Sequence, residues 1–369
     1  MLVVFALGVS TLAVEATRLL HAAAVLTRFE DPKAGGFIAD FARRQVKTEL
    51  LYVVAKSTTL RARLYIPVGV EHPPAIVLLH GIHHLGIEEP RLVRFANALA
   101  ADGILVMTPQ LDSLADYRID EESIGKSGYA AQYLRYHNGG PVGVMGLSFA
   151  GGLALLAAVD PQYGPDIAYV VAVGAHDDAG RVLRFFATNQ IERPDGTVVH
   201  MQAHEYGALV AVYTHAEAFF PASDVAEAKE AIRLWLWEQP DEARAHEAKV
   251  SRSSFEKLEK LFNHDTAALA PEILAELDRH RAEVDRLSPH GHLSGLRVPV
   301  YLLHGTGDNV IPASETLWLA RDVPKSELRW VLISPAVVHV EVEGEPTWRD
   351  QFALVRFLAA VLTEARVGS

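Results

Sequence analysis

Residues 142–152 read VGVMGLSFAGG, and this stretch decides the fold. Its first half is a short apolar run that is typical of a buried strand, and a helix of small apolar residues begins near Phe149. Ser148 lies between the two elements, with Gly146 and Ala150 two positions away on either side. A nucleophile at such a turn has a strained backbone that exposes its hydroxyl above the sheet, and small neighbours prevent clashes. We therefore expect Ser148 to be a catalytic nucleophile.

The alternative for this stretch is a glycine-rich turn that only packs a helix on a strand, as in nucleotide-binding folds. Neither G-x-G-x-x-G nor a phosphate-loop Gly-Lys-Ser stands between this strand and this helix, which disfavours that alternative. The following helix would place its positive end at Ser148, and the amide of Phe149 would point at a developing oxyanion.

Strand-like and helical segments alternate on both sides of this turn. Residues 50–55 and 60–67 have the pattern of a β-hairpin. Further strands are expected at 75–79, 104–108, 142–147, 168–173, 298–303 and 328–333, and helices at 90–102, 121–137, from about 149, and at 347–362. This alternation predicts an α/β fold whose mostly parallel central sheet is covered by helices on both faces.

The alternation stops between residues 177 and 296, a segment that we call the insert. It predicts mainly helices, at 224–238, 242–262 and 271–286, after a Pro194-Asp195-Gly196 turn. We therefore expect three parts: an N-terminal apolar helix and linker (1–46), a core (47–176 plus 297–369) and a helical insertion (177–296).

Composition excludes several classes of function. Asp and Glu number 46 against 34 Lys and Arg, a formal charge of −12 without a basic cluster, so no nucleic-acid partner is expected. The chain has no cysteine, which excludes a thiolate nucleophile, a disulfide and a cysteine-bound metal.

Residues 1–26 leave two interpretations open. The run is apolar, but Glu15, Arg18 and His21 interrupt it, and a spanning helix needs about 20 apolar residues. It is either a helix packed on the core or a short membrane anchor. Localisation accordingly stays open between a cytoplasmic and a membrane-attached protein.

The turn around Ser148 resembles the nucleophile motif of the α/β-hydrolase superfamily, in its serine-hydrolase (esterase-like) branch with a large helical cap. Ala150 replaces the last glycine of G-x-S-x-G, and the resemblance covers about residues 48–176 and 297–369. In the superfamily's chain order of nucleophile, acid and base, it implies Asp308 as the acid and His339 as the general base. Their alternatives are a surface-turn aspartate and a solvated histidine.

The resemblance also implies a backbone donor to the oxyanion from the loop that follows strand 75–79. Ile82 is the first candidate for this donor and His83 the second. The histidines at 80, 83 and 84, and His200 with His204, invite a metal site, yet neither group has the H-E-x-x-H order. We expect these histidines to be structural or solvated, with no metal and no cofactor. Asp177 and Asp178 are a second candidate acid site or, more simply, open the insert as helix caps.

These residues together predict a serine hydrolase that cleaves carboxylic esters through an acyl-enzyme, acting on a small-molecule ester or acyl substrate. The resemblance implies that the insert forms a cap over the nucleophile, with one or two of its aromatic side chains in an apolar pocket. A peptidase or amidase, and an acyltransferase or thioesterase, could use the same triad, and a non-catalytic binding protein could keep the fold. A serine nucleophile disfavours the dehalogenase and epoxide-hydrolase branches, which use aspartate.

Overall fold

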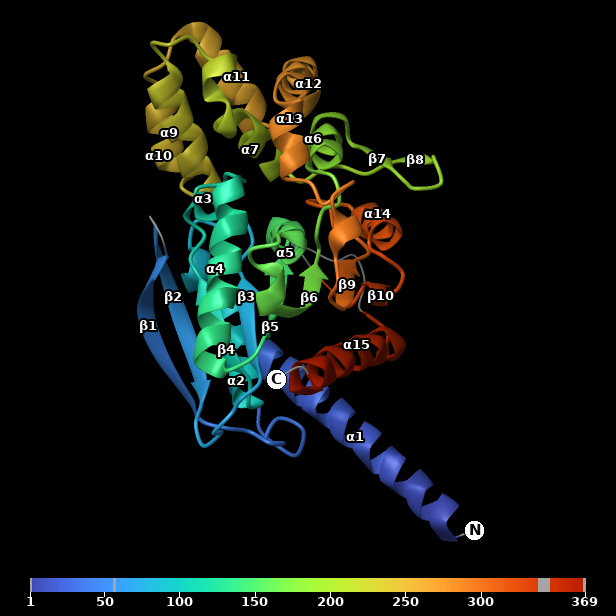
Figure 1. Cartoon of the computed structure of the whole chain (residues 1–369). Coiled ribbons are helices and arrows are strands. Elements are labelled where there is room, and N and C mark those ends of the chain that lie inside the picture. The colour runs from blue at the N-terminus through green and yellow to red at the C-terminus, as the bar shows by residue number, and fades with distance from the viewer. Residues whose placement is uncertain (1, 56–57, 338–345, 368–369) are drawn as a thin grey trace.

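The computed structural model describes residues 2–55, 58–337 and 346–367, and its centre is an eight-stranded sheet (Figure 1). The strand order is β1-β2-β4-β3-β5-β6-β9-β10. Strands β1 and β2 form an antiparallel hairpin, β2 pairs antiparallel with β4, and the other neighbours are parallel. The bounds are β1 Val46–Ala55, β2 Thr58–Pro67, β3 Ala75–Leu79, β4 Leu105–Pro109, β5 Val142–Leu147, β6 Ile167–Val173, β9 Val300–Gly305 and β10 Leu328–Ser334. The α/β fold with a mostly parallel sheet is thus confirmed.

Helices cover both faces of this sheet because its central strands are apolar on both sides. One face packs against α4 (Glu121–Asn138), α5 (Phe149–Val159) and α14 (Ser314–Asp322). The other face packs against α1 (Leu2–Glu30), α2 (Pro90–Ala101) and α15 (Trp348–Val367). Asp120 caps α4 by accepting a hydrogen bond from the Ser123 amide.

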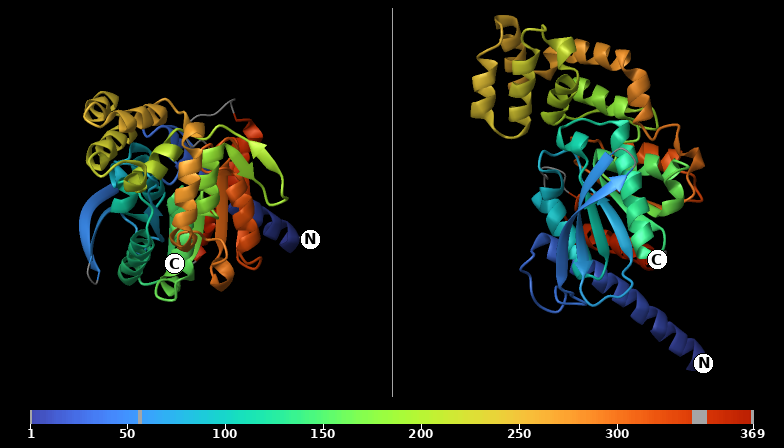
Figure 2. Two further views of the ribbon diagram at one scale, coloured as in Figure 1. Left: turned by 90° about the horizontal axis from the view of Figure 1, so that it is seen from above. Right: turned by 60° about the vertical axis from the view of Figure 1, so that its left-hand side comes forward.

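Helix α1 is longer than the apolar run that predicts it, since it continues to Glu30. Its C-terminal half packs on the core through Ala22 and Val25, while its N-terminal turns extend away from the rest of the chain (Figures 1 and 2). The packing agrees with the first interpretation of residues 1–26. None of the described helices has the length and apolar character that crossing a membrane requires.

The insert lies beyond the carboxyl ends of the parallel strands (Figure 1). It contains a two-stranded antiparallel sheet around the expected turn, and its other elements are helices. They are α6 Ala179–Thr188, β7 Gln190–Glu192, β8 Val198–His200, α7 Tyr206–Thr214, α8 Ala216–Phe219, α9 Val225–Leu236, α10 Pro240–Glu247, α11 Arg252–Phe262, α12 Ala270–Arg279 and α13 Arg281–Arg286. The insert also contains the 3₁₀ turns Thr266–Ala268 and Leu293–Gly295, and the core contains the short helix α3 Asp112–Ala115 and the 3₁₀ turns Gly86–Glu88 and Gly164–Asp166.

Two helix predictions in the insert are wrong in length. The helix expected at 242–262 is broken before Ser251, whose amide donates to the Asp224 carboxylate instead of continuing the helix. The helix expected at 271–286 is broken at His280, whose backbone leaves helical geometry. Both breaks place side chains in tertiary contacts that periodicity alone does not reveal.

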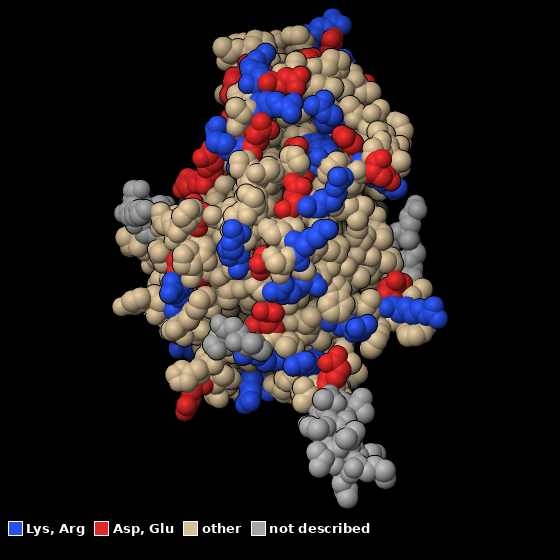
Figure 3. Space-filling view, turned by 45° about the vertical axis from the view of Figure 1, so that its right-hand side comes forward, with Lys and Arg blue, Asp and Glu red and all other residues tan. Residues whose placement is uncertain are grey.

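The surface carries charges of both signs. On the face in Figure 3, Lys and Arg side chains are interspersed with Asp and Glu. The absence of a nucleic-acid partner stays a prediction.

Candidate active site

Ser148 occupies the turn between β5 and α5 with a strained backbone. Its φ of 56° and ψ of −135° are unusual for a residue with a side chain. The turn is nevertheless well bonded, because the Ser148 amide donates to the Val173 carbonyl at 2.7 Å and the Ser148 carbonyl accepts from the Gly151 amide at 2.9 Å. The neighbouring strand β6 and the first turn of α5 therefore hold the strain in place.

The chain after β3 runs directly beside this turn. A Cβ placed on Gly81 would lie 3.2 Å from the Cβ of Ser148, so only a glycine fits easily between the loop and the serine. Ile82 follows, half-buried, and packs where the core and the insert meet. No described residue accepts a hydrogen bond from the amide of Ile82 or of Phe149, the first residue of α5. Two backbone amide donors thus lie near Ser148, one after the carboxyl end of β3 and the other after the carboxyl end of the neighbouring strand β5.

His80 fixes the start of this loop. Its Nε2 accepts a hydrogen bond from the Leu111 amide at 3.0 Å, and its Nδ1 lies 2.7 Å from the Gly81 carbonyl oxygen. These partners assign the proton to Nδ1 and leave the ring neutral. Complete burial supports this state, since it lowers the pKa of His80 to about 4. Both ring nitrogens are occupied by the protein, so His80 is a positioning residue rather than a metal ligand.

His83 and His84 of the same loop also lie among protein groups, whereas His200 is exposed. The rings of His83 and His84 stack with centroids 4.7 Å apart, and His84 stacks on Trp237 of the insert at 5.6 Å. Burial lowers the pKa of both His83 and His84. Among the described residues, the groups of side chains that could hold a metal ion lie elsewhere, and they include none of these histidines or His200 and His204.

Asp308 follows β9 and its carboxylate is held rigidly. Its Oδ1 accepts hydrogen bonds from the amides of Val310 and Ile311, both at 2.9 Å. Its Oδ2 lies 3.4 Å from Nε2 of His304. His304 is fully buried, with Nδ1 2.6 Å from the Thr316 hydroxyl and Nε2 2.8 Å from the Ile311 carbonyl oxygen. The Asp308 carboxylate is thus buried and held by hydrogen bonds. A carboxylate fixed in this way can orient a neighbouring side chain.

His339, the expected general base, lies outside the described residues. The chain leading to it is described as far as Val337, and Val337 lies against the end of β9. A Cβ on Gly305 would be 2.4 Å from the Val337 carbonyl oxygen. The Thr306 amide also donates to the Ser334 carbonyl at 3.3 Å. The segments that carry Asp308 and precede His339 are therefore neighbours.

The insert packs on the residues that surround Ser148. Phe149 and Ile311 share an apolar cluster with Val182, Phe185 and Phe186 of the insert. The Tyr117 hydroxyl donates to the Leu236 carbonyl at 2.6 Å, and the Tyr213 hydroxyl to Asp116 Oδ1 at 2.7 Å. Both bonds join the loop after α3 to the insert. Tyr213, Phe219 and Phe220 are buried in the insert's own core, as expected for most of its aromatic residues.

Asp177 and Asp178 lie where the insert begins. Asp178 caps α6 by accepting from the Arg181 amide at 3.1 Å, which confirms the capping role. Asp177 is buried, and burial together with the nearby Glu315 charge raises its pKa to about 7. Glu315 accepts hydrogen bonds from both aspartate amides and pairs with Arg181 at 2.6 Å.

Glu315 and His304 are buried polar residues that sequence reasoning missed as structural partners. His304 stands at the end of β9 and Glu315 in the first turn of α14, and only the tertiary fold brings them to their partners. A histidine and a glutamate flanking the expected acid turn are the signals that the sequence offered.

Similar solved structures include several hydrolases. Brefeldin A esterase, a bacterial homologue of human hormone-sensitive lipase, aligns over 94% of this chain and 86% of its own, with 16% identity and a TM-score of 0.50. The 2,6-dihydroxy-pseudo-oxynicotine hydrolase aligns over 85% of this chain and 68% of its own, with 18% identity and a TM-score of 0.47. An acylaminoacyl peptidase aligns over 87% of this chain but 41% of its own, with 12% identity and a TM-score of 0.48. This chain therefore spans less than half the length of that peptidase.

The sheet order and the match to the esterase decide the fold. The chain has the α/β-hydrolase fold. Its sequence matches no protein-family model and no curated protein. In an α/β-hydrolase fold the loop after β3, the β5–α5 turn and the loop after β9 all lie at the carboxyl edge of the sheet. The described candidates Ser148, Phe149, Ile82 and Asp308 stand on these three segments.

Proposed function

We propose that this chain is a serine hydrolase that cleaves carboxylic esters through an acyl-enzyme intermediate. The observation that carries the proposal is the backbone of Ser148, held at φ 56° between a buried strand and the positive end of α5. Strain of this kind persists where the surrounding structure imposes it, and it is typical of nucleophiles and other functional residues.

In the proposed mechanism Ser148 attacks the substrate carbonyl. His339 accepts the serine proton and later donates it to the leaving alcohol, and Asp308 orients the imidazole and stabilises its charged form. The amides of Phe149 and Ile82 donate hydrogen bonds to the oxyanion. Water then attacks the acyl-enzyme with His339 again acting as the base. The mechanism requires neither a metal nor a cofactor.

The insert acts as a cap over the nucleophile in this proposal. The support is that Phe149, next to the nucleophile, shares one apolar cluster with Phe185 and Phe186 of the insert. An apolar lining excludes water and strengthens the hydrogen bonds to the oxyanion, which favours an acyl or aromatic ester.

The test compares the wild type with Ser148→Ala in two assays. Turnover of a p-nitrophenyl ester should fall by roughly 10⁴-fold or more, because the covalent pathway is lost. Labelling by a fluorophosphonate should disappear in Ser148→Ala and persist in Ser326→Ala, which removes an exposed serine hydroxyl. Unchanged turnover in Ser148→Ala, or a wild type that the probe does not label, would reject the proposal.

The same residues support cleavage of an amide or a thioester and transfer to an acceptor other than water. Matched ester, aminoacyl-amide and thioester substrates, each with and without an added alcohol acceptor, distinguish these reactions. The largest Ser148-dependent kcat/KM identifies the substrate class.

A further inference from the structure

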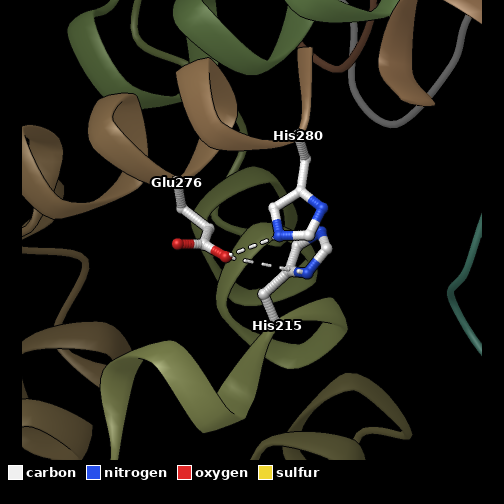
Figure 4. A group of neighbouring side chains, drawn as sticks. All are labelled: His215, Glu276 and His280. Carbon is white, nitrogen blue, oxygen red and sulfur yellow. Dashed lines mark ion pairs between the residues drawn. The ribbon is translucent and has the colours of Figure 1, made fainter. Parts of the chain in front are cut away.

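A group of three side chains in the insert is independent of the candidate active site. His215 lies between α7 and α8, Glu276 stands in the last turn of α12, and His280 follows directly after the end of that helix (Figure 4). Glu276 Oε1 is 3.0 Å from His280 Nε2 and 3.9 Å from His215 Nδ1. One possible ligand atom from each side chain lies within 4.8 Å of the other two.

The side-chain atoms of His280 and Glu276 that point away from the group are bonded to other residues. The atoms that face the group therefore remain available as ligands. His280 Nδ1 is 3.2 Å from Glu283 Oε2, so a proton on Nδ1 would face that carboxylate and leave the lone pair of Nε2 on the inner side. The other oxygen of Glu276 is paired with Arg279. Such partners of the outer atoms orient histidine and carboxylate ligands in metal sites.

Charge and burial favour a cation at this point. The carboxylate of Glu276 is almost buried, whereas His215 and His280 are partly exposed. The two imidazole rings lie close together, with centroids 4.1 Å apart, so protonating both would place like charges side by side.

We propose that His215, Glu276 and His280 form a binding site for a divalent transition-metal ion of the zinc class, completed by water. Two imidazole nitrogens and one carboxylate oxygen are a ligand set that Zn²⁺ accepts with an open fourth position. Ligand atoms around one tetrahedral zinc lie about 3.3 Å apart. The two distances from Glu276, 3.0 and 3.9 Å, bracket that spacing, and the two histidine atoms lie within 4.8 Å of each other, so side-chain rotations would have to bring the histidines closer together. The ion would join the α7–α8 junction to α12 and so stabilise the insert.

The decisive experiment measures Zn²⁺ binding to the full chain without an affinity tag, by equilibrium dialysis and calorimetry after EDTA treatment. The wild type should bind Zn²⁺ at this site. In His215→Gln and in His280→Gln, the number of zinc ions bound per chain should be lower by one. Glu283→Gln should keep the stoichiometry and weaken affinity by about 10- to 100-fold, because it removes only the partner of the His280 Nδ1. This third variant keeps the proposal testable if a ligand variant unfolds.

Two control variants each replace a histidine of the insert that pairs with a carboxylate other than Glu276. His246→Gln removes the partner of Glu227, which lies 2.7 Å from His246. This pair belongs to neither candidate metal group of the described residues. His290→Gln disrupts the second candidate group, Asp177, His290 and Asp322, where Arg181 already holds Asp177 at 2.8 Å. Both controls should retain the site and the rise in melting temperature that Zn²⁺ causes in the wild type.

Three results would overturn the proposal: no Zn²⁺ binding at micromolar concentrations, the same stoichiometry in His215→Gln and His280→Gln, or loss of binding in His290→Gln instead. Ester turnover is not a readout of this experiment. The zinc proposal and the hydrolase proposal therefore fail independently.

Discussion

A Cβ placed on Gly146 would lie 2.2 Å from the carbonyl oxygen of Ala150. The clash is with backbone, so no side-chain rotation relieves it, and either the end of β5 or the first turn of α5 must move. Gly146→Ala should therefore displace Ser148 and the Phe149 amide together. We expect ester turnover to fall by about 100-fold or more, since a displacement of about 1 Å has an effect of this size. The free energy of unfolding should fall by about 1–3 kcal/mol.

Gly140→Ala is the matched control for this substitution. Gly140 stands just before β5, and a Cβ there would meet nothing within 4 Å. Turnover and stability should stay close to wild type in urea unfolding and p-nitrophenyl ester assays. Equal turnover in Gly146→Ala and Gly140→Ala would show that the close approach at the turn does not position the nucleophile.

Asp308→Asn separates the structural role of this side chain from its proposed catalytic role. The amide oxygen can still accept from Val310 and Ile311, so the free energy of unfolding should change by less than about 1 kcal/mol. An amide cannot stabilise an imidazolium, and kcat should fall by roughly 10³- to 10⁴-fold. Asp195→Asn is the control, because Asp195 also accepts a backbone amide, that of Thr197, in an exposed turn. Full activity in Asp308→Asn would contradict the assignment of Asp308 as the acid.

His80→Ala should loosen the loop that carries the Ile82 amide. The substitution leaves the buried Leu111 amide without its acceptor, which costs about 1–3 kcal/mol of unfolding free energy. If Ile82 donates to the oxyanion, kcat should fall by about 10- to 100-fold while KM changes little. Equal losses of stability without any change in kcat would remove Ile82 from the oxyanion hole.

The lowered pKa of His80 also predicts a pH dependence. Between the ordinary pKa of 6.5 and about 4, the unfolded chain binds a proton that the folded chain does not. The free energy of unfolding contributed by His80 is therefore present above pH 6.5 and is lost as the pH falls toward 4, by roughly 3 kcal/mol in total. Urea unfolding at pH 7 and pH 5 should show the stability difference between wild type and His80→Ala narrowing at pH 5. A constant difference would mean that His80 is not held neutral.

Strand positions and the nucleophile could be predicted because their determinants are local. β3 and β5 are short apolar runs whose bounds the sequence places correctly. Ser148 is recognisable because Gly146 and Ala150 flank it. The backbone strain at Ser148 is predictable for the same reason, because a sharp turn between a buried strand and a buried helix restricts the backbone angles of the residue between them.

The breaks in the insert and several buried polar partners depend instead on tertiary contacts. Ser251 begins a new helix because Asp224, from another helix's start, takes its amide and its hydroxyl. Glu315 is buried because the fold brings the start of the insert to α14, where it binds the amides of Asp177 and Asp178. Periodicity contains no information about partners so far along the chain. The role of His339 stays a prediction.

The raised pKa of Asp177 predicts a change of the unfolding free energy with pH that is opposite in sign to that of His80. Its pKa is raised to about 7, so from the ordinary 3.8 up to 7 the folded chain holds a proton that the unfolded chain has lost. The free energy of unfolding should therefore fall as the pH rises through this window and level off above it. Asp177→Asn cannot ionise, so its stability relative to wild type should improve between pH 5 and pH 7. A relative stability that is independent of pH would show that Asp177 is ionised throughout.

Asp102 joins α1 to the core, and its removal should release that helix. The buried carboxylate lies 3.0 Å from Arg28 Nη2, 2.6 Å from Arg366 Nη2 and 2.9 Å from His21 Nδ1. Asp102→Ala leaves the buried Arg28 guanidinium without its counter-charge, which costs about 3–5 kcal/mol. Because Arg28 also donates to the Phe41 carbonyl at 3.2 Å, the connection after α1 should loosen too.

Urea unfolding and limited proteolysis between residues 31 and 45 measure these two effects. Cleavage should accelerate in Asp102→Ala and stay at the wild-type rate in Glu15→Ala. Glu15 pairs with Arg18 at 3.8 Å on an exposed part of the same helix, and such a pair contributes about 0–1 kcal/mol. If both variants lost less than about 1 kcal/mol and resisted proteolysis equally, the apolar contacts of Ala22 and Val25 would be sufficient to hold α1 on the core without the charge network.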